Sequence, residues 1–438
     1  MPVRVRIRGL SHGGEGVGEQ EDGLTWFVPG ALPGELVEVQ PQRRKARWAR
    51  GHLLQVLEPG PDRVPAPCAL ADRCGGCDWQ HVRESVQSEH KRAIVAGQLR
   101  ALVADESQVR LAKVRSPSLG YRRRARMHYV REGDELRLGF YAPRSKDVVD
   151  VAACPVLRPE LETAMMKLRA LPAHLLPEQG EVMGLSDGQR VSLALPGVRP
   201  DEAVVEAVRA LLDERLVGVV LRGGRRSVTV GAPELTLDGG DGIAPMHANA
   251  FVFTQTNAVV NRALVRHVVA AARPDGLRVL ELYAGAGNLS RALARSARRV
   301  FTLDEDQEAS NMLQNLARAE GLPIKARHGS APNLLARLAE AAKAEPRGSE
   351  AGDKKRYDVV VVDPPRRGLG EATSVHLAEV ATQRVVYVSC DPATLARDLR
   401  VLVGKGMSIT DVTVFDMMPM TAQVEVVVTL ARVPKGGR

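Results

Sequence analysis

Hydrophobic and polar residues alternate with a period of two through the first 58 residues, and glycine-containing turns interrupt the alternation. The alternating runs cover residues 3–10, 23–40 and 48–58. Short strands separated by turn signals at close intervals are typical of small β-barrels. We therefore predict an OB-like β-barrel at the start of the chain.

A second pattern begins near residue 264, where short buried runs alternate with helical segments. This order predicts a doubly wound, Rossmann-like α/β sheet. Its expected strands are residues 278–282, 300–303, a weaker one near 324, 357–362, 385–388 and 421–430, and its expected helices are residues 289–297, 332–344 and a segment from 393. Residues 345–356 have the composition of a surface loop. Residues 84–103 predict another helix, and residues 155–245 mix both periods without a chemical motif.

Length and charge limit the class of protein. A chain of 438 residues is too long for one ordinary core, so two or three domains are expected. The 61 Lys and Arg residues outnumber the 52 Asp and Glu residues, and the net charge of +9 favours a polyanionic partner, with nucleic acid as the leading candidate. No run approaches the roughly 18 apolar residues of a membrane helix. We expect a cytoplasmic protein without membrane contacts, and no obligate protein partner is indicated.

Two basic segments contain aromatic residues as well. Residues 42–50 hold five cations and Trp48, and four arginines lie between Tyr121 and Tyr129. Cations beside a stacking ring suit contacts with RNA phosphates and bases. A solvated hairpin tip and an edge strand protected by charge would have the same composition, so both alternatives stay open.

Three cysteines, Cys68, Cys74 and Cys77, lie within ten residues, and Cys154 follows far downstream. An odd total of five cysteines argues against a disulfide framework. Two glycines between Cys74 and Cys77 let the backbone turn tightly. The group predicts a metal site, and spacing alone leaves a structural zinc and an iron–sulfur cluster open.

Cys390 directly follows a predicted buried strand and precedes a predicted helix. Asp391 can cap that helix, and Pro392 suits its first position. Ligands of open α/β sheets bind where strands end, and a helix N-terminus would favour a thiolate over a thiol. Cys390 is therefore a candidate nucleophile; the alternative is a buried structural cysteine.

A glycine-rich turn follows the first strand of the predicted sheet and runs from Tyr283 to Asn288. Such a turn lets a ligand approach the backbone closely. The second strand ends at Asp304, where a carboxylate can hold the ribose hydroxyls of an adenosyl ligand. NAD would suit this geometry too, but Ser290 occupies the position of the third glycine, so S-adenosylmethionine (SAM) fits better.

Two further carboxylates suggest the chemistry. Asp363 ends a predicted strand and emerges at the same edge as Asp304 and Cys390. Its Asp-Pro-Pro motif is also found in amino-methyltransferases, but those have an aromatic residue where this chain has Arg366.

Glu425 lies in the last predicted strand. An isolated Glu in a strand usually faces water, but opposite Cys390 burial of Glu425 would raise its pKa toward that of a base. A thiolate and a base suit methylation of uracil at C5, because thiolate addition at C6 makes C5 nucleophilic and a base must then remove the C5 proton.

Together these motifs resemble the RNA uracil-5-methyltransferase family, most closely its iron–sulfur members that methylate 23S ribosomal RNA. The resemblance implies a TRAM barrel that binds RNA at residues 1–58, a central α+β iron–sulfur domain at residues 59–80 and 114–250, and a SAM-dependent methyltransferase domain at residues 81–113 and 251–438. It implies an RNA substrate, 23S rRNA first, with the T-loop uridine of tRNA as the alternative.

The resemblance also implies roles for single residues. The nucleophile falls on Cys390 and the general base on Glu425. The SAM contacts fall on Gln255, Tyr283, Asn288, Asp304 and Asp363, and the ligands of a [4Fe–4S] cluster on Cys68, Cys74, Cys77 and Cys154. A non-catalytic RNA-binding or assembly module with a vestigial SAM domain is the alternative of a different class, and it predicts loss of the nucleophile or the base.

The chain departs from the family pattern at four positions. Asp391 stands where Asn is common and Ala284 where Cys is common, while Met420 and Gln423 occupy positions where histidines are often seen. Because the nucleophile, the base and the cluster ligands are intact, these departures bear on which nucleotide is modified more than on the reaction.

Overall fold

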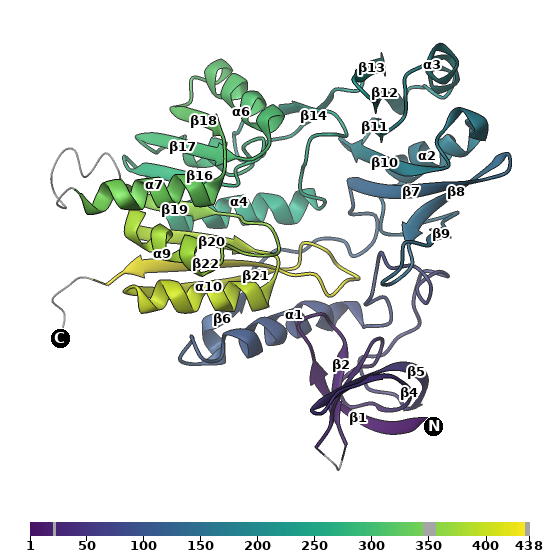
Figure 1. The fold of residues 1–438 in the computed structure, drawn as a ribbon, viewed down its shortest axis with the longest axis horizontal. Coiled ribbons are helices and arrows are strands. Elements are labelled where there is room, and N and C mark those ends of the chain that lie inside the picture. The colour runs from purple at the N-terminus through teal and green to yellow at the C-terminus, as the bar shows by residue number, and fades with distance from the viewer. Residues whose placement is uncertain (21–22, 345–355, 434–438) are drawn as a thin grey trace. The chain divides into compact units, whose positions relative to one another are not determined.

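The structure, a computed structural model, describes residues 1–20, 23–344 and 356–433. The predicted surface loop at residues 345–356 lies outside the described residues except for Arg356. The chain forms two compact units (Figure 1). The first comprises Met1–Gln87, Arg115–Ala258 and Met418–Ala422, and the second comprises Ser88–Val114, Val259–Met417 and the chain from Gln423 onward.

The first unit begins with the predicted barrel. Its strands are β1 (Val3–Leu10), β2 (Gly16–Glu19), β3 (Thr25–Val28), β4 (Leu36–Arg44) and β5 (Trp48–Glu58), closed in the order β1-β2-β3-β5-β4. Alternate side chains, among them Val5, Ile7, Trp26 and Val28, fill its interior, as the period of two predicts. The predicted β-barrel is therefore confirmed.

The rest of the first unit surrounds a second sheet. In the described residues this sheet has seven strands in the order β13-β12-β11-β10-β7-β8-β9. Their bounds are β7 (Arg124–Glu132), β8 (Glu135–Tyr141), β9 (Val148–Asp150), β10 (Gln179–Ser186), β11 (Val191–Pro196), β12 (Leu216–Gly223) and β13 (Arg226–Gly231). The first unit also contains two helices, α2 (Pro159–Met166) and α3 (Glu202–Arg209). A separate two-stranded sheet is formed by β14 (Leu235–Leu237) and β15 (Met246–Ala248). Leu161 and Met165 of α2 and Val204 and Val208 of α3 join the buried side chains of the sheet in one apolar core.

The second unit contains the doubly wound sheet. Over the residues that the structure describes it has eight strands, in the order β18-β17-β16-β19-β20-β22-β21-β6. Their bounds are β6 (Val109–Leu111), β16 (Arg278–Leu282), β17 (Arg299–Asp304), β18 (Ile324–His328), β19 (Tyr357–Val362), β20 (Ala381–Ser389), β21 (Met407–Phe415) and β22 (Glu425–Arg432). Strands β16 to β20 pair in parallel, whereas β22 is antiparallel to both of its neighbours. The predicted methyltransferase-type sheet is confirmed, and its antiparallel end is an addition that periodicity did not indicate.

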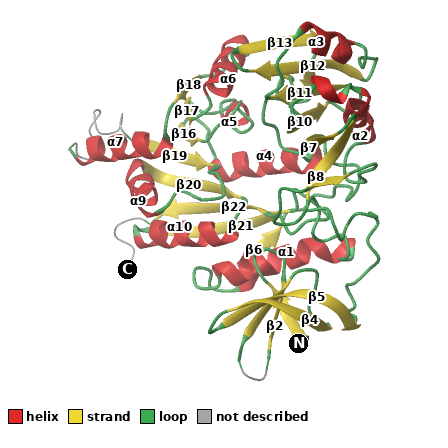
Figure 2. Ribbon diagram, turned by 45° about the vertical axis from the view of Figure 1, so that its right-hand side comes forward, coloured by secondary structure: helices red, strands yellow, loops and turns green. Residues whose placement is uncertain are grey.

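Helices cover both faces of this sheet (Figure 2). They are α1 (Glu84–Leu99), α4 (Ala258–Ala272), α5 (Ser290–Leu293), α6 (Gln307–Ala319), α7 (Ala331–Lys343), α9 (Glu371–Val380) and α10 (Pro392–Gly404). Leu99, Leu335, Leu377 and Leu395, each from a different helix, are fully buried in one core with the valines of the sheet. Burial of this aliphatic surface supplies the main driving force for the unit, at about 25 cal/mol per Å² of apolar area.

Two predicted elements have different bounds. The helix expected at residues 289–297 is assigned only over Ser290–Leu293, although backbone bonds such as Ala297 N to Leu293 O extend its turns. The last strand begins at Glu425, not at residue 421, because Met418–Ala422 makes its hydrogen bonds within the first unit. None of the helices in the described ranges is long and apolar enough to cross a membrane.

Candidate active site

The register of the second unit's sheet brings several predicted residues to one edge. Leu282 pairs with Leu303 and with Val362, so β16, β17 and β19 end together. Ser389 at the end of β20 pairs with Val426 of the antiparallel β22. Because the two strands run antiparallel, the next pair beyond Ser389 and Val426 is Cys390 and Glu425, which therefore lie opposite each other. Asp363 directly follows β19 at the same edge.

Cys390 lies between the buried second half of β20, residues 385–389, and the start of α10. The Asp391 carboxylate caps that helix by accepting hydrogen bonds from the backbone N–H groups of Ala393 at 3.0 Å and Thr394 at 2.9 Å, and Pro392 occupies the first turn. This local structure is as predicted. The expected thiolate is not favoured in the free protein, because burial, with the charge of Glu425, raises the pKa of the Cys390 thiol to about 11.

The buried Glu425 lies close enough to the half-buried Asp363 for the two acids to influence each other. Burial and the neighbouring Asp363 charge raise the pKa of Glu425 well above its ordinary value. Burial raises the pKa of Asp363 to about 6. Glu425 is buried at the edge of the sheet and does not face water, as expected for a residue opposite Cys390. A carboxylate with a raised pKa is a stronger base once it is ionised.

The loop after Asp363 brings a cation to these acids. The charge of Arg366 lowers the pKa of both Cys390 and Glu425, opposing the effect of burial. The backbone oxygen of Arg366 accepts a hydrogen bond from Thr394 Oγ1 at 2.9 Å, and its guanidinium donates to the side-chain oxygen of Gln423. Arg366 was singled out in the sequence only as a missing aromatic residue, and its place directly after Asp-Pro-Pro is the signal for its role.

A fully buried carboxylate, Asp398 of α10, fixes the far end of this loop. It accepts hydrogen bonds from the backbone N–H groups of Leu369 at 2.7 Å and Gly370 at 3.2 Å and from the Tyr387 hydroxyl at 2.7 Å. Gly368, at φ +69°, lies so close that an added Cβ would be 2.5 Å from Asp398 Oδ2. The loop that carries Arg366 therefore has one tightly bound conformation.

The glycine-rich turn lies at the same edge of the sheet. Tyr283, Gly285 and Gly287 all have positive φ, and Gly285 N donates to Asp304 Oδ2 at 2.8 Å. A Cβ added at Gly285 would meet nothing within 4 Å, so the space over the turn is open, whereas one at Gly287 would be 2.4 Å from Leu313 Cδ1. An open space over a backbone turn, with a partly exposed carboxylate beside it, fits an adenosyl ligand.

Two of the residues predicted to contact SAM make other interactions in this structure. The Asn288 side chain exchanges two hydrogen bonds with Asn261 of α4, at 2.8 and 3.0 Å. Gln255 belongs to the first unit, where its backbone oxygen accepts a hydrogen bond from Arg123 Nε at 3.0 Å. Behind the turn, burial raises the pKa of Glu281 to about 8, and this carboxyl group accepts a hydrogen bond from Ser290.

The four predicted cluster cysteines line one cavity in the first unit. They are joined there by Arg122 and by apolar side chains such as Phe140 and Val156. The Cys74 sulfur accepts a hydrogen bond from Gly76 N at 3.4 Å, and the Cys68 sulfur accepts one from Leu70 N, also at 3.4 Å. No group of three or more His, Cys, Asp or Glu side chains within the described ranges is arranged to hold a metal ion.

Arg122 and Phe253 were missed by the sequence analysis as individual residues. Arg122 lines the same cavity as these four cysteines, and its Nε is buried without a hydrogen-bond partner in the described chain. Phe253 is 67% exposed and has the guanidinium of Arg124 5.3 Å from its ring centroid. An exposed aromatic residue two positions before Gln255 is a signal that the sequence did offer.

The fold and site define a class of protein. A doubly wound sheet with an open glycine turn and an acid at the end of the second strand is the arrangement of a SAM-type methyltransferase, and here a thiol and a carboxyl group lie next to each other at the same edge. The sequence profile described as tRNA (Uracil-5-)-methyltransferase matches residues 234–433, and that of the TRAM domain matches residues 2–54.

Relatives agree over nearly the whole chain. Proteins named 23S rRNA (uracil(1939)-C(5))-methyltransferase RlmD are 33% identical in Pseudomonas putida, over 96% of this chain and 92% of that protein, and 34% identical in Chromohalobacter salexigens, over 99% and 90%. The crystal structure of Pyrococcus abyssi tRNA (uracil-54, C5)-methyltransferase with S-adenosyl-L-homocysteine covers 98% of this chain and 99% of its own, with a TM-score of 0.71 and 23% identity. The chain belongs to the RNA uracil-5-methyltransferase family, and the predicted family is confirmed.

The raised pKa of Cys390 gives a first prediction. Alkylation of Cys390 by iodoacetamide in the RNA-free protein, followed by peptide mass mapping, should accelerate about tenfold per pH unit through the neutral range, because only the thiolate reacts. Arg366→Gln should slow alkylation at a fixed pH, Arg366→Lys should largely retain it, and Glu425→Gln should accelerate it. A rate that levels off near neutral pH, or one indifferent to Arg366→Gln, would contradict these electrostatics.

Proposed function

We propose that the protein methylates C5 of a uridine in 23S rRNA through a covalent adduct between Cys390 and uracil C6. The observation that carries the proposal is the sheet register that makes Cys390 and Glu425 neighbours at the carboxyl edge. The names of the full-length relatives support ribosomal RNA as the substrate. The likeness to the archaeal tRNA enzyme concerns the fold alone and does not favour the T-loop alternative.

The first chemical step creates a nucleophile. The Cys390 thiolate forms a bond to C6, and the electrons of the C5–C6 double bond move toward C5, which becomes enolate-like. Arg366 supports this step because its charge lowers the pKa of the thiol. SAM held over the glycine turn would supply the methyl group that C5 takes, with S-adenosylhomocysteine as the leaving group.

The second step releases the product. Glu425 in its ionised form takes the proton from C5, the electron pair restores the C5–C6 double bond, and the bond between C6 and the Cys390 sulfur breaks. The raised pKa of Glu425 makes it a stronger base than an exposed glutamate. Retention of both Cys390 and Glu425 argues against a vestigial, non-catalytic module.

The residues proposed to bind SAM keep the roles implied by the family. Asp304 would hold the ribose, and Tyr283 and Asn288 flank the turn over which the open space lies. Gln255 and Asp363 complete the proposed contacts. Asp363 would act close to the reacting atoms, since its charge raises the pKa of both Glu425 and Cys390.

We further propose a [4Fe–4S] cluster held by Cys68, Cys74, Cys77 and Cys154. The four thiols gather round one cavity, and two of them accept backbone N–H hydrogen bonds of the kind that stabilise cluster sulfurs. In a cluster each thiolate binds a different iron, so the sulfurs need not surround a single point. The buried guanidinium of Arg122 would compensate the negative charge of the bound group.

The domain boundaries predicted from the sequence stand as part of this proposal: an RNA-binding TRAM barrel at residues 1–58, a cluster domain at 59–80 and 114–250, and a methyltransferase domain at 81–113 and 251–438. In the barrel, Arg43 lies 5.5 Å over the Trp48 ring, next to the basic hairpin tip. We place the protein's action in the cytoplasm, where ribosomal RNA is available.

Trapping experiments test the mechanism. With SAM and a 23S rRNA fragment that carries 5-fluorouridine, the protein should form a covalent adduct that survives denaturing electrophoresis, because fluorine cannot be removed as a proton. Cys390→Ala should form no adduct, because it lacks the nucleophile. Cys154→Ser keeps the nucleophile and should therefore still form adduct. With ordinary uridine, Glu425→Gln should accumulate adduct. Methyl transfer by Cys390→Ala would refute the mechanism.

Iron analysis tests the cluster. Anaerobically purified protein should contain about four irons and four acid-labile sulfides per chain, as [4Fe–4S] requires. Cys154→Ser should lose most of this iron, and Cys390→Ala, the matched thiol outside the cavity, should retain it. One zinc per chain with no labile sulfide would contradict the cluster.

A further inference from the structure

The connection between β21 and β22 contains a segment that we name the strap, Met418–Ala422. The strap packs within the first unit, while the chain on either side of it, ending at Met417 and resuming at Gln423, belongs to the second. Strand β22 begins at Glu425. The general base is therefore separated from the last strap residue by only two residues, which span at most about 10 Å even when extended.

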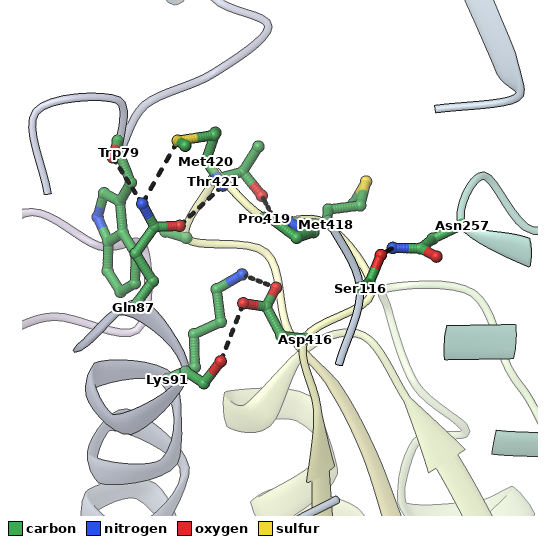
Figure 3. Close-up of polar contacts among 12 residues, drawn as sticks. Trp79, Gln87, Lys91, Ser116, Asn257, Asp416, Met418, Pro419, Met420 and Thr421 are labelled. Carbon is green, nitrogen blue, oxygen red and sulfur yellow. Dashed lines mark hydrogen bonds and ion pairs between the residues drawn. The ribbon is translucent and has the colours of Figure 1, made fainter. Parts of the chain in front are cut away.

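Met420, at the centre of the strap, is hydrogen-bonded through its N–H, its carbonyl and its sulfur. Met420 is 6% exposed and has a φ of +66°, a left-handed conformation that is unfavourable for a residue other than glycine. Its N–H donates to Gln87 Oε1 at 2.8 Å, its carbonyl accepts from Trp79 N at 3.1 Å, and its sulfur accepts from Gln87 Nε2 at 3.5 Å (Figure 3). These bonds offset the conformational cost and fix the backbone.

The ends of the strap are bound as well. Ala422 N donates to Asp78 Oδ1 at 2.7 Å, and the Tyr121 hydroxyl donates to the Pro419 carbonyl at 3.0 Å. Within the strap, Thr421 Oγ1 donates to Met418 O at 2.8 Å. Asp78 and Trp79 directly follow Cys77, so the segment that holds the strap is continuous with a cysteine of the cluster cavity.

The other end of the connection is anchored separately in the second unit. Asp416 forms an ion pair with Lys91 at 2.5 Å (Figure 3). It also accepts a hydrogen bond from Ser88 Oγ at 3.2 Å. Lys91 is fully buried. Asp416 is therefore anchored two positions before the strap begins.

We propose that Asp78 and Gln87 are positioning residues for Glu425, acting through the strap. The inference rests on the proposed role of Glu425 as the base that removes the C5 proton. Proton transfer requires the base within about 3 Å of the proton donor, and a misplacement of about 1 Å can cost roughly 100-fold in rate. Cys390 is held by β20 and the Asp391 cap, so its attack on C6 does not depend on the strap.

The inference predicts a separation of two rates. Release of the strap should slow adduct breakdown, which needs Glu425, and leave adduct formation, which needs Cys390, nearly unchanged. A general loss of fold would slow both. Asp78 suits the test because its side chain is exposed and its Oδ1 accepts a hydrogen bond from Ala422 N of the strap.

The experiment uses the iron-loaded full-length protein, SAM and an end-labelled, unmodified 23S rRNA fragment in single turnover, with adduct measured on denaturing gels. Asp78→Ala should slow adduct breakdown about tenfold, and Asp78→Asn, which keeps the acceptor oxygen, should restore it. Gln87→Met, which keeps the volume but removes the bonds to Met420, should act like Asp78→Ala. Iron content and unfolding midpoint are measured for each variant.

A double variant separates this inference from the proposed function. If Asp78 acts through Glu425, adding Asp78→Ala to Glu425→Gln should not slow breakdown further, because residues that act as a unit are non-additive. Failure of Glu425→Gln alone to accumulate adduct would overturn the proposed role of Glu425. Accumulation by Glu425→Gln together with unchanged breakdown in both Asp78→Ala and Gln87→Met would overturn the role of the strap alone, as would additive effects in the double variant.

Discussion

The constraint on which the rest of this structure depends is the crowding of three acidic groups, the buried Glu425 and the half-buried Cys390 and Asp363, at one edge of a sheet. Cys390, Glu425 and Asp363 share a setting that penalises charge, and the charge of Asp363 raises the pKa of both other groups. A neutral thiol and a neutral carboxyl group are poor partners for covalent catalysis. The site therefore needs a cation, and Arg366 supplies one whose charge lowers the pKa of the thiol and of Glu425.

The fold meets this need by fixing the loop that follows Asp363. Two backbone N–H groups of this loop donate hydrogen bonds to the fully buried carboxylate of Asp398. Gly368 lets the loop backbone lie close to that carboxylate, because it has no Cβ. Loss of these partners would leave a buried carboxylate unsatisfied and would strongly destabilise the folded protein. The conformation of the loop and the packing of α10 therefore depend on each other. The parallel strands place the glycine turn and Asp304 at the same edge, and the antiparallel β22 returns Glu425 to it.

Much of this arrangement could be predicted from the sequence, because it follows from local rules. A period of two indicated the barrel, the strand at residues 357–362 matched β19, and Asp391 and Pro392 marked the start of α10. Electrostatics over longer range could not be predicted in this way. The helix N-terminus favoured a thiolate at Cys390, but burial and Glu425 outweigh it. The apolar residues before Glu425 suggested a strand, yet contacts with Asp78 and Gln87, more than 300 positions away, decide their conformation.

The central claim is that the Cys390–Glu425 pair methylates C5 of a uridine in 23S rRNA. Mapping of 5-methyluridine in ribosomal RNA and tRNA from cells with the native gene, without it, and with Cys390→Ala in its place tests this claim most directly. We expect one 5-methyluridine in 23S rRNA to disappear in the last two strains, with tRNA unchanged. A 23S rRNA that keeps all of its 5-methyluridine, with loss in the tRNA T-loop instead, would contradict it.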